Sequence, residues 1–129
     1  MSHSDPLKRT LSIYGHVREQ GLETQLALPK LLSVDRVGDD ILLTMEYMGP
    51  DYNSHVPVTL SKFKELCDVT RKELSNAGVG DRMSHDKANW CIVTQGCNHR
   101  AYLVDVGRCV LSAKALGMTK ERREVVAFD

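Results

Sequence analysis

The sequence lacks an excess of either charge and is poor in aromatic residues. Its 17 Lys and Arg residues balance 17 Asp and Glu residues, so the formal net charge at pH 7 is zero with His neutral. Binding to nucleic acid or to an anionic membrane normally needs a basic excess on one face, so we expect neither as a partner. Aromatic residues make up 5% of the chain, and Trp90 is the single tryptophan. We expect this bulky side chain to serve packing or contact.

Long hydrophobic runs and a secretory signal are also missing. The longest apolar stretch, 41–48, contains Thr44 and Glu46 and is far shorter than the roughly 20 residues of a transmembrane helix. The first residues do not show a basic region followed by an apolar core. We therefore expect a cytoplasmic, reducing environment, in which the four cysteines are free thiols rather than a disulfide framework.

What is present fits one domain of 129 residues, without a repeat or a linker that would divide it. Helical spacing of apolar residues predicts a helix over about 5–20, with Pro6 at its first position. The β-branched and leucine content of 31–37, the turn residues 38–40 and the apolar stretch 41–48 predict an antiparallel hairpin. The fold class is therefore expected to be α+β.

The second half of the chain predicts a longer helix and another hairpin. Apolar residues fall on one face from Thr59 or Ser61 to about Ala77, with Ser61 available as a cap and Gly78 as a stop. A polar loop is expected over 79–89, followed by strands at 90–94 and 101–106. Two further segments are less regular: 110–116 is helix or irregular, and 119–128 is a short final element.

Two side chains that carry oxygen ligands are expected to meet at one end of the second hairpin. Asn89 precedes its first strand and Asp105 follows its second, and antiparallel strands return the chain to its start. Two oxygen ligands with room for water and phosphate are typical of Mg²⁺ sites on nucleotides. The alternative is that Asn89 is a turn residue and Asp105 ends a strand.

The order of these elements resembles the middle of a protein-kinase-like fold. The resemblance is closest to the small kinase-like domains common in fungal genomes, which are distantly related to aminoglycoside phosphotransferases. It covers roughly Leu7 to the C-terminus and rests on the order and spacing of short motifs. It implies a partial kinase-like fold, with a small-lobe hairpin and helix and the start of the helical lobe. Residues 1–58 would be the small-lobe-like part and hinge, and residues 59–129 a partial large lobe, of one truncated domain.

The resemblance also implies roles for individual residues. The stretch 41–48, followed by Gly-Pro, resembles the last small-lobe strand entering the hinge, which makes Glu46 and Met48 nucleotide-binding residues. Asn89 resembles the metal-binding asparagine of the catalytic loop. The triplet that begins with Asp105 resembles the Asp-Phe-Gly motif, with Val in place of Phe. The implied cofactors are Mg²⁺ and ATP.

The sequence departs from the kinase pattern where catalysis would take place. In the family the catalytic loop reads His-x-Asp-x-x-x-x-Asn. Counting back from Asn89 places Ser84 where the catalytic Asp should stand and Arg82 where the His should stand. A loop two residues shorter would let His85 and Asp86 supply these groups instead. The sequence also contains no Gly-rich phosphate loop, no Val-Ala-x-Lys strand and little of the large lobe, and such losses together should be disabling.

We therefore expect a catalytically degenerate kinase-like domain with residual Mg-nucleotide binding. It would act as a binding or regulatory module, with a protein partner or by self-association. One alternative is a minimal ATP-dependent phosphotransferase that uses His85 and Asp86 and is completed by another chain. Another is a plain protein-interaction domain without kinase ancestry.

Two cysteines and a histidine suggest a zinc site, because Cys91, Cys97 and His99 are spaced C-x₅-C-x-H on one hairpin. This spacing does not fit paired C-x₂-C knuckles. We expect buried or idle thiols instead.

Overall fold

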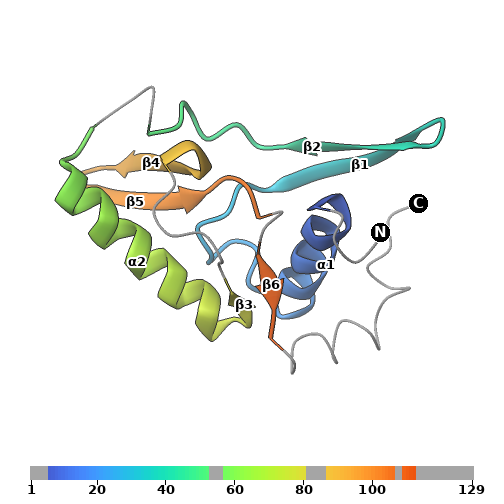
Figure 1. Cartoon of the computed structure of the whole chain (residues 1–129), viewed down its shortest axis with the longest axis horizontal. Coiled ribbons are helices and arrows are strands. Elements are labelled where there is room, and N and C mark those ends of the chain that lie inside the picture. Colours follow the sequence, from blue (N-terminus) through green and yellow to red (C-terminus); the bar gives the residue numbers. More distant parts are fainter. Residues whose placement is uncertain (1–5, 53–56, 81–86, 107–108, 113–129) are drawn as a thin grey trace.

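The computed structural model of the chain describes residues 6–52, 57–80, 87–106 and 109–112, and these form a mixed α+β architecture (Figure 1). In chain order the elements are α1 (Pro6–Glu19), β1 (Leu31–Val37), β2 (Asp40–Met45), α2 (Leu60–Asn76), β3 (Val79–Gly80), the 3₁₀ helix η2 (Lys87–Asn89), β4 (Trp90–Gln95), β5 (Asn98–Leu103) and β6 (Val110–Leu111). None of the helices in these ranges has the length and apolar character needed to cross a membrane.

Within the described ranges the strands pair in twos, as the antiparallel sheets β1–β2, β3–β6 and β4–β5. The predicted first hairpin is confirmed, and its register runs from Val37 opposite Asp40 to Ser33 opposite Thr44, with an irregularity before Ser33. The second strand ends at Met45 rather than at residue 48, so the prediction was too long by three residues. The ladder ends at Leu31 opposite Met45 and continues only as hydrogen bonds between Lys30 and Glu46, because Pro29, the next residue back, has no N–H to donate.

Helix α1 confirms the predicted N-terminal helix. It buries Ile13, Tyr14 and Val17 in the core. Its His16 is also buried, and the Nε2 atom of this residue lies 2.7 Å from the Ala77 carbonyl oxygen at the end of α2. The two helices are therefore joined by a polar contact as well as by the shared core.

Helix α2 is capped by Thr59, the earlier of the two predicted starts, and not by Ser61 two residues later. The cap is Thr59, whose extended backbone lets its side chain accept a hydrogen bond from the Lys62 amide at 3.2 Å. The helix buries Phe63, Cys67, Thr70 and Leu74, which lie on the predicted face, while Leu60 in its first turn stays 46% exposed. The predicted stop is confirmed, because Gly78 has a φ of +90°.

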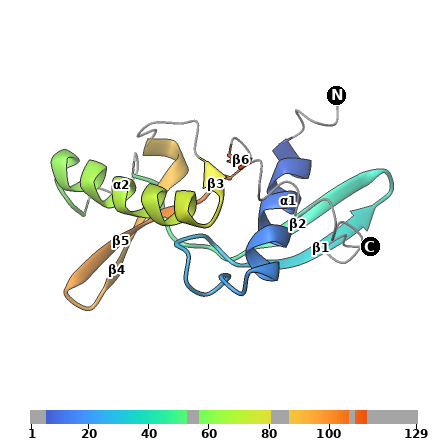
Figure 2. The same ribbon diagram turned by 90° about the horizontal axis from the view of Figure 1, so that it is seen from below.

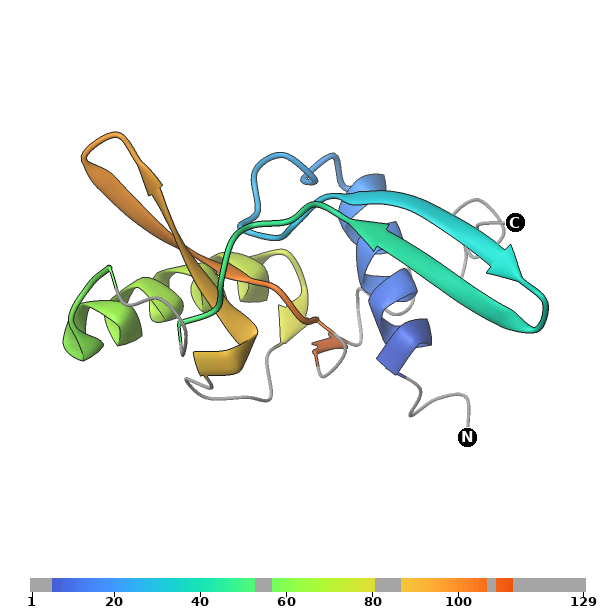
Figure 3. The same ribbon diagram turned by 90° about the horizontal axis from the view of Figure 1, so that it is seen from above.

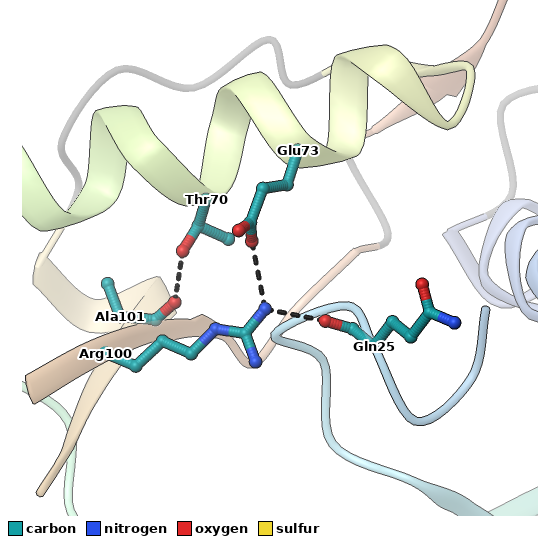
Figure 4. Close-up of polar contacts among 5 residues, drawn as sticks. All are labelled: Gln25, Thr70, Glu73, Arg100 and Ala101. Atoms are coloured by element: carbon teal, nitrogen blue, oxygen red, sulfur yellow. Dashed lines mark hydrogen bonds and ion pairs between the residues drawn. The ribbon is translucent and has the colours of Figure 1, made fainter. Parts of the chain in front are cut away.

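Three hydrogen bonds hold α2 and the segment before β1 against β5 (Figure 4). The Thr70 hydroxyl donates to the Ala101 carbonyl at 2.6 Å. The Arg100 guanidinium donates from Nη2 to the Gln25 carbonyl at 2.6 Å and to Glu73 Oε1 at 2.9 Å. Helix α2 and the segment before β1, which are far apart in sequence, therefore both contact Arg100 and Ala101, two neighbouring residues of β5.

The region around β3 and β6 differs from the prediction. We expected the polar loop to begin at residue 79 and the segment from 110 to be helical or irregular. Instead Val79 pairs with Leu111 and Gly80 with Val110, and the side chains of Val79 and Leu111 are buried. This pairing is non-local, so neither segment carries a periodicity that reveals it. The predicted element at 119–128 lies outside the described residues.

The second hairpin is confirmed, with strands at Trp90–Gln95 and Asn98–Leu103 and a shorter turn than expected. Trp90 is fully buried, as expected for a residue placed for packing. Its indole N–H has no hydrogen-bond partner among the described residues.

One hydrophobic core joins most of these elements. It includes Ile13 and Val17 of α1, Phe63 and Leu74 of α2, and Trp90 of β4. The views from the side and from below show α2 and the β4–β5 hairpin in one half of the molecule and α1 in the other, with β3 and β6 between them (Figures 1 and 2). The β1–β2 hairpin projects away from α2, and the turn between its strands lies at the end farthest from α2 (Figure 3).

Candidate functional site

A pocket of about 420 Å³ lies where the connection after β2 passes the base of the β4–β5 hairpin. It is lined by Pro29, residues 45–51, Ala88 and Val104. The connection supplies one wall, and the residues before β4 and after β5 supply the other. The pocket therefore forms where four separate segments of the chain come together.

Backbone and side-chain hydrogen bonds hold the first half of the connection in place. The Glu46 amide donates to the Lys30 carbonyl at 2.9 Å, and Glu46 Oε1 accepts from the Lys30 amide at 3.1 Å. Pro29, the next residue back, accepts a hydrogen bond from the Tyr14 hydroxyl at 2.5 Å. Through Tyr14, helix α1 thus positions the segment whose Lys30 is hydrogen-bonded to Glu46.

A thiol holds the second half of the connection. Cys91 of β4 is buried, and its Sγ donates to the Met48 carbonyl at 3.1 Å. A Cβ atom on Gly49 would lie 3.6 Å from the same sulfur, and Gly49 has a φ of +111° that side-chain-bearing residues rarely adopt. The next turn is also tied to β4, because the Tyr52 amide donates to the Trp90 carbonyl at 3.1 Å.

The charged side chains that line the pocket are carboxylates, Glu46 and Asp51. Burial, and then the nearby Asp51, raise the pKa of the Cys91 thiol, which keeps it protonated as a donor to Met48. Burial, and then the charge of Glu46, likewise raise the pKa of the Tyr14 hydroxyl well above its usual range. The two groups that position the connection are therefore both held in their neutral, donating forms.

The two predicted metal ligands lie beside this pocket. The Val104 amide donates to the Asn89 carbonyl at 2.9 Å, so the predicted meeting of the two hairpin ends is present in the backbone. Asn89 follows the pocket residue Ala88, and Asp105 follows the pocket residue Val104. Asn89 is half-buried and Asp105 is exposed.

These oxygen donors suit a hard cation such as Mg²⁺, which binds one or two carboxylates together with phosphates and water. In the described ranges, no group of three or more His, Cys, Asp or Glu side chains is placed to hold a metal ion.

Of the residues singled out from the sequence, Glu46 and Met48 line the pocket. Asn89 and Asp105 are not among the lining residues, but each directly follows one of them, Ala88 and Val104. Ser84, His85 and Asp86, the candidates for the catalytic position, lie outside the described residues.

Sequence reasoning missed Asp51 and Cys91. Asp51 stands in the most loop-like stretch of the chain, where a carboxylate is unremarkable. The sequence suggested Cys91 as part of a zinc site, but in the structure it is buried in β4 while Cys97 is exposed in the hairpin turn, and none of the four cysteines, all within the described ranges, forms a disulfide. Only the tertiary contact with Met48 shows its role.

The comparisons with known proteins found no matching family model and no matching curated protein.

Proposed function

We propose that this chain is a kinase-like domain with a degenerate active site, which keeps a Mg-nucleotide pocket and acts as a binding or regulatory module. The observation that carries the proposal is the pocket beside the connection after β2. Its lining includes the expected hinge residues Glu46 and Met48 and the direct neighbours of Asn89 and Asp105. Two of the residues to which the resemblance assigns a role thus line the pocket, and the other two directly follow lining residues, which supports the proposal.

The chemistry of the lining agrees with the two ends of a nucleotide. The volume of about 420 Å³ is within the range of small-molecule pockets, roughly 300–1,000 Å³. Met45, Met48 and Val104 offer apolar surface to a base. Glu46 and Asp51 would repel phosphates, so binding of a triphosphate requires a divalent cation. Asn89 and Asp105 would hold that cation, which screens the phosphate charge.

Isothermal titration calorimetry with ATP tests this proposal. We expect micromolar affinity in the presence of Mg²⁺, much weaker binding when EDTA replaces it, and loss of binding in Asp105→Ala. Asp35→Ala is the matched control, because it removes an exposed carboxylate from β1, outside the pocket lining. Absence of binding to the wild-type protein would overturn the nucleotide site.

A turnover assay separates a binding module from an enzyme. The proposal predicts no transfer of labelled γ-phosphate to water or to protein acceptors by the purified chain. Turnover that survives purification and disappears in Asp86→Asn would replace the binding role with the minimal phosphotransferase.

A further inference from the structure

The β1–β2 hairpin is a projecting ribbon of two strands, and among the described residues no third strand pairs with either outer edge (Figure 3). It also exposes apolar side chains: Leu42 is 55% exposed, and Leu32 and Val37 are each 60% exposed. An unpaired strand with exposed apolar side chains is a template for pairing with another strand.

The two edges of this ribbon differ in their charge. Strand β1 carries the exposed charges of Asp35 and Arg36 near its middle. Strand β2 has no charged residue after Asp40, and no proline, over the stretch Ile41–Met45. Charged residues on an edge strand discourage the addition of another strand. The edge of β2 is therefore the one open to pairing.

The register of the hairpin determines which backbone groups face this edge. The two-residue turn at Gly38 and Asp39 closes on the pair of Val37 and Asp40. From there, hydrogen-bonded and non-hydrogen-bonded pairs alternate along an antiparallel ladder. Asp40, Leu42 and Thr44 consequently direct their backbone groups towards β1. Ile41 and Leu43 direct theirs outward, away from β1.

We propose that β2 pairs with β2 of a second copy of this chain, antiparallel about a two-fold axis at Leu42, to make a four-stranded sheet. In this register Leu42 faces Leu42 of the second copy as a non-hydrogen-bonded pair. Ile41 faces Leu43 and exchanges backbone hydrogen bonds with it, and Asp40 faces Thr44. The exposed side chains stay on one face of the joined sheet and the half-buried ones on the other.

Charge selects this register over its neighbour. An axis at Leu43 would also align the outward backbone groups, but it would set Asp40 opposite Glu46 of the other copy. Like charges directly opposite one another destabilise a strand pair. The axis at Leu42 leaves no like charges opposed within β2, so the strand is complementary to itself. This inference concerns the β2 edge and is independent of the proposed nucleotide pocket.

The pairing is short, so the dimer is expected to be weak and in rapid exchange, like other interfaces that bury less than about 1,200 Å². Disulfide trapping suits such a complex. In a Cys97→Ser background, which removes the exposed native thiol, Leu42→Cys should form a disulfide-linked dimer in a glutathione redox buffer. A non-hydrogen-bonded pair has a Cα separation of about 4.5 Å, within disulfide range.

Thr44→Cys is the matched control, because Thr44 is also exposed and lies on the same face of β2. In the proposed register two Thr44 residues lie four positions apart along the strands, at least about 13 Å, which is beyond disulfide reach. We expect rapid cross-linking of Leu42→Cys and little of Thr44→Cys. Equal cross-linking of the two variants, or none of Leu42→Cys, would overturn the proposal.

Sedimentation velocity at increasing concentration gives an independent readout. Wild-type protein should show a concentration-dependent rise in its average sedimentation coefficient, and Leu42→Lys should abolish it by placing two ammonium groups opposite each other. Val37→Lys adds the same charge to an equally exposed site on β1 and should leave the rise unchanged. Circular dichroism checks that both variants fold. A monomeric wild-type protein at all concentrations, or a dimer unaffected by Leu42→Lys, would contradict the pairing.

Discussion

At the scale of single residues, the pocket wall depends on Gly49 and Cys91. Gly49 contributes its backbone conformation, and Cys91 contributes a protonated thiol. Gly49 lets the connection after β2 adopt a φ of +111° beside Cys91. The Cys91 thiol, whose pKa is raised by burial and by Asp51, donates to the Met48 carbonyl at 3.1 Å. Together they determine where the backbone of the pocket wall runs.

We predict that Gly49→Ala destabilises the fold and weakens ligand binding together. An L-residue at this φ costs about 1–3 kcal/mol of unfolding free energy, and relief of this backbone strain would shift the pocket wall. Gly96→Ala is the matched control, since Gly96 has a φ of +64° in the β4–β5 turn and should lose about 1–2 kcal/mol. Urea denaturation measures both losses. Calorimetry should show weaker Mg-ATP binding for Gly49→Ala alone, and equal binding by the two variants would contradict the role given to Gly49.

At the scale of elements, α2 is joined to the second hairpin by more than apolar contact. Thr70 is 1% exposed and donates to the Ala101 carbonyl. Arg100 joins the same strand to Glu73 and Gln25, and its guanidinium carbon lies 5.7 Å from the centre of the Tyr102 ring. These directional contacts set the position of α2 along β5, which apolar packing alone specifies less strictly.

Removing the Thr70 hydroxyl should therefore be costly. Thr70→Val keeps the shape of the side chain but leaves the buried Ala101 carbonyl without this donor, and we expect a loss of about 1–3 kcal/mol. Thr94→Val is the control, because the Thr94 hydroxyl contacts His99 on an exposed part of the hairpin, and it should change stability by less than about 0.5 kcal/mol. Chemical denaturation of the two variants would decide the point, and equal losses would count against the buried contact.

At the scale of the whole molecule, stability should fall in alkaline solution. The hydroxyl of Tyr14 has its pKa raised by burial and by Glu46, so the folded state keeps its proton after an unfolded chain has lost it. Because the unfolded state then binds fewer protons, the free energy of unfolding decreases as pH rises above about 10, the ordinary pKa of tyrosine. Below that pH the contribution of Tyr14 is fully present.

Thermal unfolding between pH 7 and pH 11 tests this prediction. Tyr14→Phe should lower stability by about 1 kcal/mol at pH 7, since the Pro29 carbonyl loses its donor, and should make the alkaline decline shallower. Tyr47→Phe changes a residue that is 82% exposed and should leave both the neutral stability and the decline unaltered. A decline of the same steepness in wild type and Tyr14→Phe would assign the effect to other groups.

Much of the fold could be predicted where the signal is local. The turn residues Gly38 and Asp39, the apolar face of α2 and the stop at Gly78 are short-range features, and the elements around them lie where the sequence placed them. The sheet of β3 and β6 could not be predicted, because each strand has two residues and finds its partner across most of the second half of the chain. The kinase resemblance remains a proposal.

The candidate site likewise combines residues that could be predicted from the sequence with contacts that only the tertiary structure shows. Hairpin geometry singled out Asn89 and Asp105, because antiparallel strands return Asp105 to Asn89, whereas Glu46 and Met48 were singled out only by the resemblance to a kinase hinge. Sequence by itself thus determined the two helices, the two hairpins and which oxygen-bearing residues lie at their ends. Only the tertiary structure decided that the Cys91 thiol donates to the Met48 carbonyl, that Glu46 and Met48 line one pocket with the neighbours of Asn89 and Asp105, and that no other described strand pairs with the β2 edge. Those outcomes depend on contacts between distant segments. Bringing such segments together costs chain entropy, and this cost is offset only when the whole core forms.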